Sequence, residues 1–151
     1  PLAITASDSY FMSDEKAGLA APLKRDGKGW AVAEHGLRGN SAGGGYSTTR
    51  DMLKFARGLV AGKIISKENL NTLLTSKTRG LSEALEYGYG FILSDEGKVP
   101  SFGHGGIASG VNFELRYFPQ YDMTFVAFCN QDNGAYDDLR KNVIKLITGA
   151  R

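Results

Sequence analysis

The sequence contains one cysteine, Cys129, and two histidines, His35 and His104. A single cysteine cannot form an intrachain disulfide or a multi-cysteine zinc site. Two histidines without more cysteines do not make a conventional zinc set, and no spacing of carboxylates completes one, so we expect no metal and no cofactor. We expect Cys129, in the apolar run MTFVAFCN, to be a small buried hydrophobic residue.

Charge of one sign is also scarce. Eighteen basic and 16 acidic side chains leave a formal net charge of +2, and the basic residues form no continuous stripe. Nucleic-acid binding depends on a dense positive surface, so we expect no nucleic-acid partner. No apolar run approaches the roughly 18 residues of a membrane-spanning helix. The 42% hydrophobic and 23% charged content is instead typical of a globular domain.

Two helices are predicted in residues 46–80. Ser47 or Thr48 can cap a helix that ends at Gly62, and Ser66 can cap a second helix within residues 66–76. In the first helix, five apolar residues recur at helical spacing on one face: Met52, Phe55, Ala56, Leu59 and Val60. Residues 1–45 are rich in glycine, alanine, serine and aspartate, which predicts extended loops with room for one helical turn.

The period of the apolar pattern changes after residues 77–86, which we predict to be a loop. Four short aromatic or β-branched runs separated by turn residues predict antiparallel hairpins: residues 87–94, 99–106, 111–119 and 123–130. The pattern of residues 136–149 predicts a helix that covers the sheet. Its apolar face consists of Leu139, Val143, Ile144 and Ile147.

The predicted fold class is therefore α+β. We expect an antiparallel sheet of about three to four strands, covered by a C-terminal helix and preceded by two helices and a loop-rich segment. Residues 1–151 form one unit in this prediction, with loops in 1–45, helices in 46–80, and the sheet and last helix in 85–151.

The stretch GHGGIASG places His104 among four glycines between Gly103 and Gly110. Gly105 and Gly106 carry no side chains, so another group can approach the backbone closely there. Local context leaves two interpretations open, the edge of a pocket and a glycine-rich bend that holds an incidental histidine.

A nucleophile is harder to find. Ser13 and Lys16 match the pattern S-x-x-K, in which a lysine activates a serine. The composition gives close to one such match by chance, and Ser13 is followed by two acidic residues in a polar segment. We therefore do not assign Ser13 as the nucleophile.

The order of several segments resembles the C-terminal part of the serine β-lactamase and penicillin-binding-protein superfamily. The segments are SAGGGYSTTRDMLKFARGLVAG, YGYGF, GHGGIASGVNFELRYFP and MTFVAFCN, followed by the last helix. They are most similar to the branch of class C β-lactamases, D-alanyl-D-alanine carboxypeptidases, D-aminopeptidases and β-lactamase-like esterases. The resemblance covers nearly the whole chain. It implies a partial β-lactamase or transpeptidase-like fold and acyl-enzyme hydrolysis of an ester, an amide or peptide, or a β-lactam.

Three motifs meet in one cleft in that superfamily: S-x-x-K, Y-x-N or S-x-N, and K-T-G, which is often H-x-G in esterase-like members. His104, Gly105 and Gly106 match the third motif. The resemblance implies that His104 is a donor or charge near the leaving group or a substrate carboxylate. It also implies that the Ile107 N–H supplies half of an oxyanion hole, and that Gly105 and Gly106 bind the substrate closely.

Two departures from the family pattern matter. Gly105 stands where the K-T-G form has a hydroxyl residue, which weakens the case for penicillin-type recognition, and no Y-x-N or S-x-N occurs. A catalytic unit without its nucleophile loses nearly all of its rate. We therefore expect this chain to be inactive alone, and to be the C-terminal portion of a longer hydrolase, or of a clipped pair, completed by a missing N-terminal part.

Two alternatives stay open at this point. The chain could be a non-catalytic binding or regulatory module that keeps the cleft but has lost the nucleophile. It could also self-associate through an uncovered sheet edge or apolar face.

Overall fold

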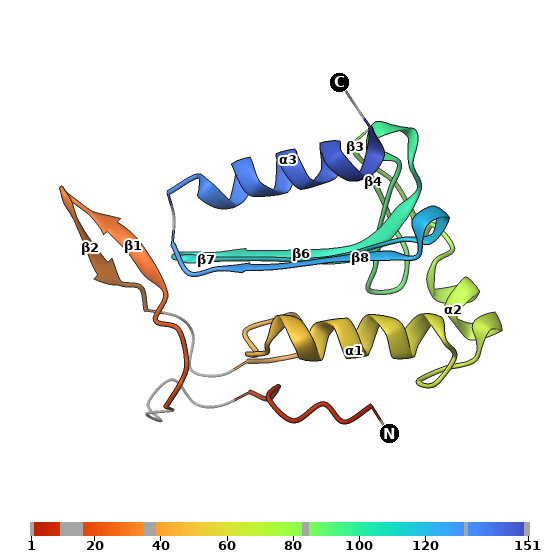
Figure 1. The fold of residues 1–151 in the computed structure, drawn as a ribbon, viewed down its shortest axis with the longest axis horizontal. Coiled ribbons are helices and arrows are strands. Elements are labelled where there is room, and N and C mark those ends of the chain that lie inside the picture. Colours follow the sequence, from red (N-terminus) through yellow and green to blue (C-terminus); the bar gives the residue numbers. More distant parts are fainter. Residues whose placement is uncertain (1, 10–16, 35–38, 83–84, 132, 150–151) are drawn as a thin grey trace.

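A six-stranded antiparallel sheet lies between helices in the part of the chain that the structure describes (Figure 1). The computed structural model describes residues 2–9, 17–34, 39–82, 85–131 and 133–149. The strands follow the order β3-β4-β5-β6-β7-β8, so each strand pairs with its neighbour in the sequence. Seen along the sheet, α3 covers one face and α1 covers the other (Figure 1).

The central strands of the sheet are long and its outer strands on one side are short. The sheet consists of β3 (Thr78–Ser82), β4 (Leu85–Tyr87), β5 (Ile92–Ser94), β6 (Ser101–Ala108), β7 (Val111–Phe118) and β8 (Met123–Cys129). The helices are α1 (Thr49–Val60), α2 (Lys67–Leu73) and α3 (Ala135–Thr148), with 3-10 turns η1 (Glu96–Lys98) and η2 (Pro119–Tyr121).

The antiparallel sheet, the two preceding helices and the C-terminal helix over the sheet were predicted from the sequence and are present. The predicted number of about three to four strands is wrong, because residues 77–86, predicted as a loop, contribute β3 and β4. These two strands have no alternating apolar pattern. Backbone hydrogen bonds to neighbouring strands hold them in the sheet, such as Lys77 N–H to the Tyr87 carbonyl at 2.8 Å.

The loop-rich prediction for residues 1–45 also needs correction. Within the described residues, this segment contains a hairpin of β1 (Leu23–Asp26) and β2 (Gly29–Val32), which projects from one end of the molecule (Figure 1). Most of its side chains are exposed, so the apolar alternation that would predict strands is absent. The hairpin is held at its base, where the Leu23 N–H donates to the Asn130 carbonyl at 2.9 Å.

The helix starts follow the predicted caps. Thr48 is the N-cap of α1, and its side chain accepts a hydrogen bond from the Asp51 N–H at 3.1 Å. Ser66 is the N-cap of α2 and accepts from the Asn69 N–H at 3.1 Å. Both bonds satisfy a backbone donor that has no partner within its own helix.

Each face of the sheet has its own apolar core. Under α3, the cluster contains Val99, Phe118, Phe125, Ala127, Tyr136 and Ile144, with Cys129 partly buried against it. Under α1, it contains Leu59, Leu70 and Phe102, with Phe55, Leu93 and Tyr117 packed alongside. Leu139 was predicted to face the sheet but is 48% exposed. Tyr136, one turn earlier in α3, is buried instead. No helix among the described residues is long and apolar enough to cross a membrane.

Candidate functional site

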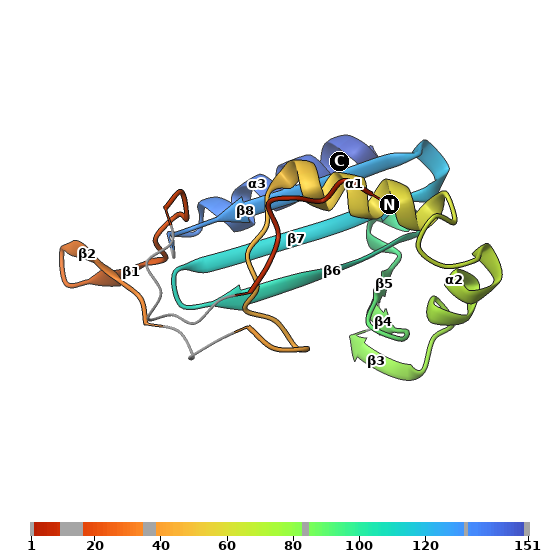
Figure 2. The same cartoon turned by 90° about the horizontal axis from the view of Figure 1, so that it is seen from below.

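One edge of β6 is open along the stretch that contains the predicted site residues. β6 pairs with β7 from Phe102 to Ala108, but it pairs with β5 only from Ser101 to Gly103. Beyond Gly103, no described strand lies against this edge, and Figure 2 shows β6 and β7 running on past β5. Backbone N–H and C=O groups of an unpaired edge can bind another extended group. His104, Gly105, Gly106 and Ile107 all lie on this open segment.

The His104 side chain lies on the α1 side of the sheet. Side chains alternate along a strand, so His104 shares a face with Phe102, which packs against Leu59 of α1. His104 is nevertheless exposed, and α1 packs mainly against β8 (Figure 2). The imidazole is therefore accessible from solvent.

Two hydrogen bonds hold the imidazole in place. Its Nε2 lies 2.9 Å from the Tyr87 hydroxyl, and its Nδ1 lies 2.5 Å from the Gly105 carbonyl oxygen. The Tyr87 and His104 rings also meet edge to face, with centroids 5.7 Å apart and planes at 87°. Sequence reasoning missed Tyr87, since only the sheet register brings β4 within reach of β6.

The three glycines around His104 differ in what stands next to them. A Cβ on Gly103 would overlap the Leu115 carbonyl oxygen, so no side chain fits there. A Cβ on Gly105 would lie 3.2 Å from a Glu114 carboxylate oxygen. A Cβ on Gly106 would meet nothing closer than 3.9 Å, and its φ is not positive. Within the described residues, packing explains the first two glycines but not Gly106, which leaves space in front of the strand.

A buried ion cluster lies behind Gly105, between β7 and α3. Glu114 and Arg116 are 4% and 5% exposed, and Glu114 Oε1 lies 2.6 Å from Arg116 Nη2. The Tyr136 hydroxyl donates to Glu114 Oε2 at 2.9 Å, and Arg140 reaches the same oxygen at 3.5 Å. Burial and the Glu114 carboxylate raise the pKa of Tyr136 well above its ordinary value. The space beside Gly105 on this face is thus occupied by Glu114.

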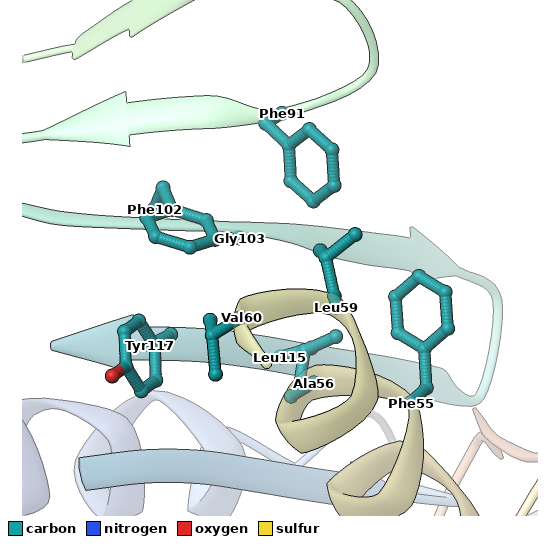
Figure 3. Close-up of a pocket in the computed structure, with 9 residues that line it drawn as sticks. All are labelled: Phe55, Ala56, Leu59, Val60, Phe91, Phe102, Gly103, Leu115 and Tyr117. Carbon is teal, nitrogen blue, oxygen red and sulfur yellow. The ribbon is translucent and has the colours of Figure 1, made fainter. Parts of the chain in front are cut away.

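Ile107 is 83% exposed, so its side chain contributes little to either core. Two hollows in the described part of the chain lie away from Ile107. One is an apolar gap of about 10 Å³ between α1 and the sheet, which core side chains such as Phe55, Leu59 and Phe102 line (Figure 3). The other is an open hollow of about 610 Å³ near the end of α1, beside Arg57 and Asp122. His104 lines neither of these two hollows, and its side chain is exposed to solvent.

Three further residues were considered as candidates from the sequence. Ser13, Lys16 and His35 lie outside the described residues. Among the residues that are described, no group of three histidine, cysteine or acidic side chains could hold a metal ion.

Comparison with known proteins was made for both sequence and fold. The family model "Beta-lactamase" matches residues 8–149. A search of curated proteins found no match. Among solved structures, the fold is similar to a penicillin binding protein from Bacillus halodurans, with a TM-score of 0.84 and 23% identity over 95% of this chain and 45% of that one.

Two further solved structures share the fold. A D-stereospecific amidohydrolase from Streptomyces sp. gives a TM-score of 0.70 and 20% identity over 87% of this chain and 41% of that one. A D-amino acid amidase from Ochrobactrum anthropi SV3, complexed with D-phenylalanine, gives a TM-score of 0.62 and 23% identity over 74% of this chain and 34% of that one. This chain therefore spans less than half the length of each of these three structures.

Proposed function

Because this chain belongs to the beta-lactamase family, we propose that it supplies the H-x-G side of a serine hydrolase active site that works through an acyl-enzyme. The observation that carries the proposal is the open edge of β6, which leaves His104 exposed and the adjoining backbone unpaired by any described strand. In this proposal His104 lines the substrate pocket, and the Ile107 N–H supplies half of the oxyanion hole.

The glycines have separate roles in the proposal. Gly106 lets the substrate approach the strand, since the space in front of it is free. Gly105 contributes its backbone, and a side chain there would be in tight contact with the Glu114 carboxylate.

We propose an ester or amide as the substrate class, ahead of a β-lactam. The missing hydroxyl at Gly105 removes one hydrogen-bonding partner for a penicillin-type substrate. Two of the structures with the same fold are a D-stereospecific amidohydrolase and a D-amino acid amidase, which is consistent with amide chemistry.

The nucleophile in this proposal comes from outside the chain, in the remaining part of the same protein. The sequence has no Y-x-N or S-x-N, and its one weighed S-x-x-K match lies in a polar segment. The matched structures are more than twice as long as the part that this chain covers, which leaves room for those motifs elsewhere.

Covalent labelling tests the proposal. The protein expressed from the longest reading frame that contains this chain is treated with a fluorophosphonate probe, and the labelling rate is compared with that of two variants. His104→Ala is expected to label on the order of 100-fold more slowly. Leu146→Ala, which changes a leucine that is 83% exposed on α3, is the control and should label normally. Absence of labelling in the unmodified protein, or equal rates with and without His104, would contradict the proposal.

A second candidate is a non-catalytic binding or regulatory module of the same family. The lack of Y-x-N and S-x-N in this sequence favours it. If the longest reading frame also lacks an S-x-x-K ahead of this chain, and the protein binds penicillin or substrate amides reversibly without labelling, the binding module is the better description.

A further inference from the structure

We infer that Tyr87 is a positioning residue for His104, which holds the imidazole with Nε2 as a hydrogen-bond acceptor and so selects substrates that present an N–H donor. This inference rests on the proposed function, because it assigns the substrate group that meets the H-x-G histidine. It makes His104 an acceptor, in place of the donor or charge near a carboxylate that the family resemblance implies.

The first step concerns Nδ1. This atom lies 2.5 Å from the Gly105 carbonyl oxygen, which can only accept a hydrogen bond. Nδ1 must therefore carry the proton. This bond favours the neutral tautomer that has its lone pair on Nε2.

The second step concerns the Tyr87 hydroxyl. It lies 2.9 Å from Nε2, and since Nε2 has no proton in the neutral ring, the hydroxyl donates to it. The edge-to-face contact between the two rings also limits rotation of the imidazole. Tyr87 thus restrains both the plane of the ring and the nitrogen that faces it.

The third step is that Tyr87 is itself held firmly. Its carbonyl accepts from the Lys77 N–H at 2.8 Å, and it pairs with Ile92 of β5. The turn that follows is tied down as well, because the Tyr89 N–H donates to the Leu73 carbonyl at 2.8 Å and no Cβ would fit on Gly88 beside the same carbonyl. The backbone that carries the Tyr87 hydroxyl is therefore held on both sides of the residue.

The consequence for the substrate holds in either binding mode. If a substrate group displaces the hydroxyl from Nε2, it must donate a hydrogen bond to the nitrogen. If it binds beside the pair, it meets the lone pairs of a hydroxyl whose proton already points at His104. In both cases the pair offers an acceptor, which fits an amide N–H or an amine and disfavours a carboxylate.

Nitrogen NMR tests the position of Tyr87 without any need for activity. The protein from the longest reading frame is labelled with ¹⁵N-histidine, and the His104 signals are assigned by their loss in His104→Gln. At a pH where the ¹⁵N chemical shifts report a neutral His104 ring, we expect the proton to be on Nδ1. Tyr87→Phe keeps the aromatic ring but removes the hydroxyl, and should raise the population protonated on Nε2. Tyr89→Phe removes a hydroxyl from the same turn, where the ring faces the Lys77 ammonium, and should leave the signals unchanged.

Ligand titration of the same sample tests the substrate class. Phenylalaninamide is expected to shift the His104 Nε2 signal in a saturable manner, and phenylacetate is not. A proton on Nε2 in the unmodified protein, or no effect of Tyr87→Phe, would overturn the role of Tyr87. A shift with phenylacetate alone, or with neither ligand, would overturn the selection of N–H donors. Failure of fluorophosphonate labelling with the NMR results as expected would instead count against the hydrolase function only.

Discussion

Glu114 lies directly behind Gly105: the two residues are register partners in β7 and β6, and a Cβ on Gly105 would stand 3.2 Å from the Glu114 carboxylate. Gly106, the next residue, has free space where its side chain would be. The two glycines of the H-x-G segment therefore differ in their surroundings: Gly105 is tightly packed and Gly106 is accessible.

Substitutions at these two positions should separate in stability. Gly105→Thr forces a side chain against a buried carboxylate and is expected to lower the free energy of unfolding by about 1–3 kcal/mol. Gly106→Ala should change it by less than about 0.5 kcal/mol. Urea denaturation followed by fluorescence gives both values. Equal losses at the two positions would contradict the difference in packing.

The same Gly106→Ala variant should be defective in function. Its methyl group occupies the space through which a substrate would approach the β6 backbone, and small displacements of a reacting group lower rates strongly. We expect fluorophosphonate labelling to slow by at least about tenfold. If the variant folds and is labelled at the normal rate, the substrate does not approach the β6 backbone at Gly106.

Glu114 should be among the most sensitive residues for stability. Glu114→Ala leaves Arg116, itself buried, without its 2.6 Å partner, and we expect a loss of about 3–5 kcal/mol in the free energy of unfolding. Glu96→Ala is the comparison variant, because Glu96 is more exposed and pairs with Arg140 at 2.8 Å but with the buried Arg116 only at 3.6 Å. Its loss should stay near or below about 1 kcal/mol. Thermal or urea unfolding of the two variants decides the matter.

Asp51 should make stability depend on acid pH. Its Oδ2 accepts from the Ala6 N–H at 2.7 Å and from the Ser7 hydroxyl at 3.1 Å, which ties the first residues of the chain to α1. The Ala6 N–H is the main cause that lowers the pKa of Asp51 in the folded protein. The unfolded state then binds the proton more readily, so this stabilisation is present above about pH 4 and is lost as pH falls through the folded pKa.

Removing the titrating group tests that assignment. Asp51→Asn is expected to flatten the fall in unfolding free energy between about pH 5 and pH 2, measured by urea denaturation at each pH. Asp26→Asn, at the exposed end of β1, should leave the acid slope as it is. A slope that persists in Asp51→Asn would assign the acid sensitivity to another carboxylate.

The N-cap of α1 is a local feature with a predictable cost. Thr48→Ala removes the side-chain acceptor for the Asp51 N–H and should destabilise the protein by about 1 kcal/mol. Thr48→Ser keeps the acceptor and should restore most of the loss. If alanine and serine behave alike, the cap contributes nothing measurable.

The sequence by itself determined the elements whose signals are local. Thr48 and Ser66 mark the helix starts because a side-chain oxygen can satisfy a backbone donor three residues away in any tertiary context. The aromatic and β-branched runs of β7 and β8 are strands for a similarly local reason, and the order of segments around His104 was enough to identify the family that the model match supports.

The tertiary structure alone decided the remainder. β3 and β4 lack an apolar pattern and exist through pairing in the sheet, and Leu139 is exposed because the packed helix turns Tyr136 inward. The burial of Glu114 and Arg116 and the contact between Tyr87 and His104 depend on which strands lie side by side. Register between strands is set by contacts between residues far apart in sequence, and local preference carries no record of it.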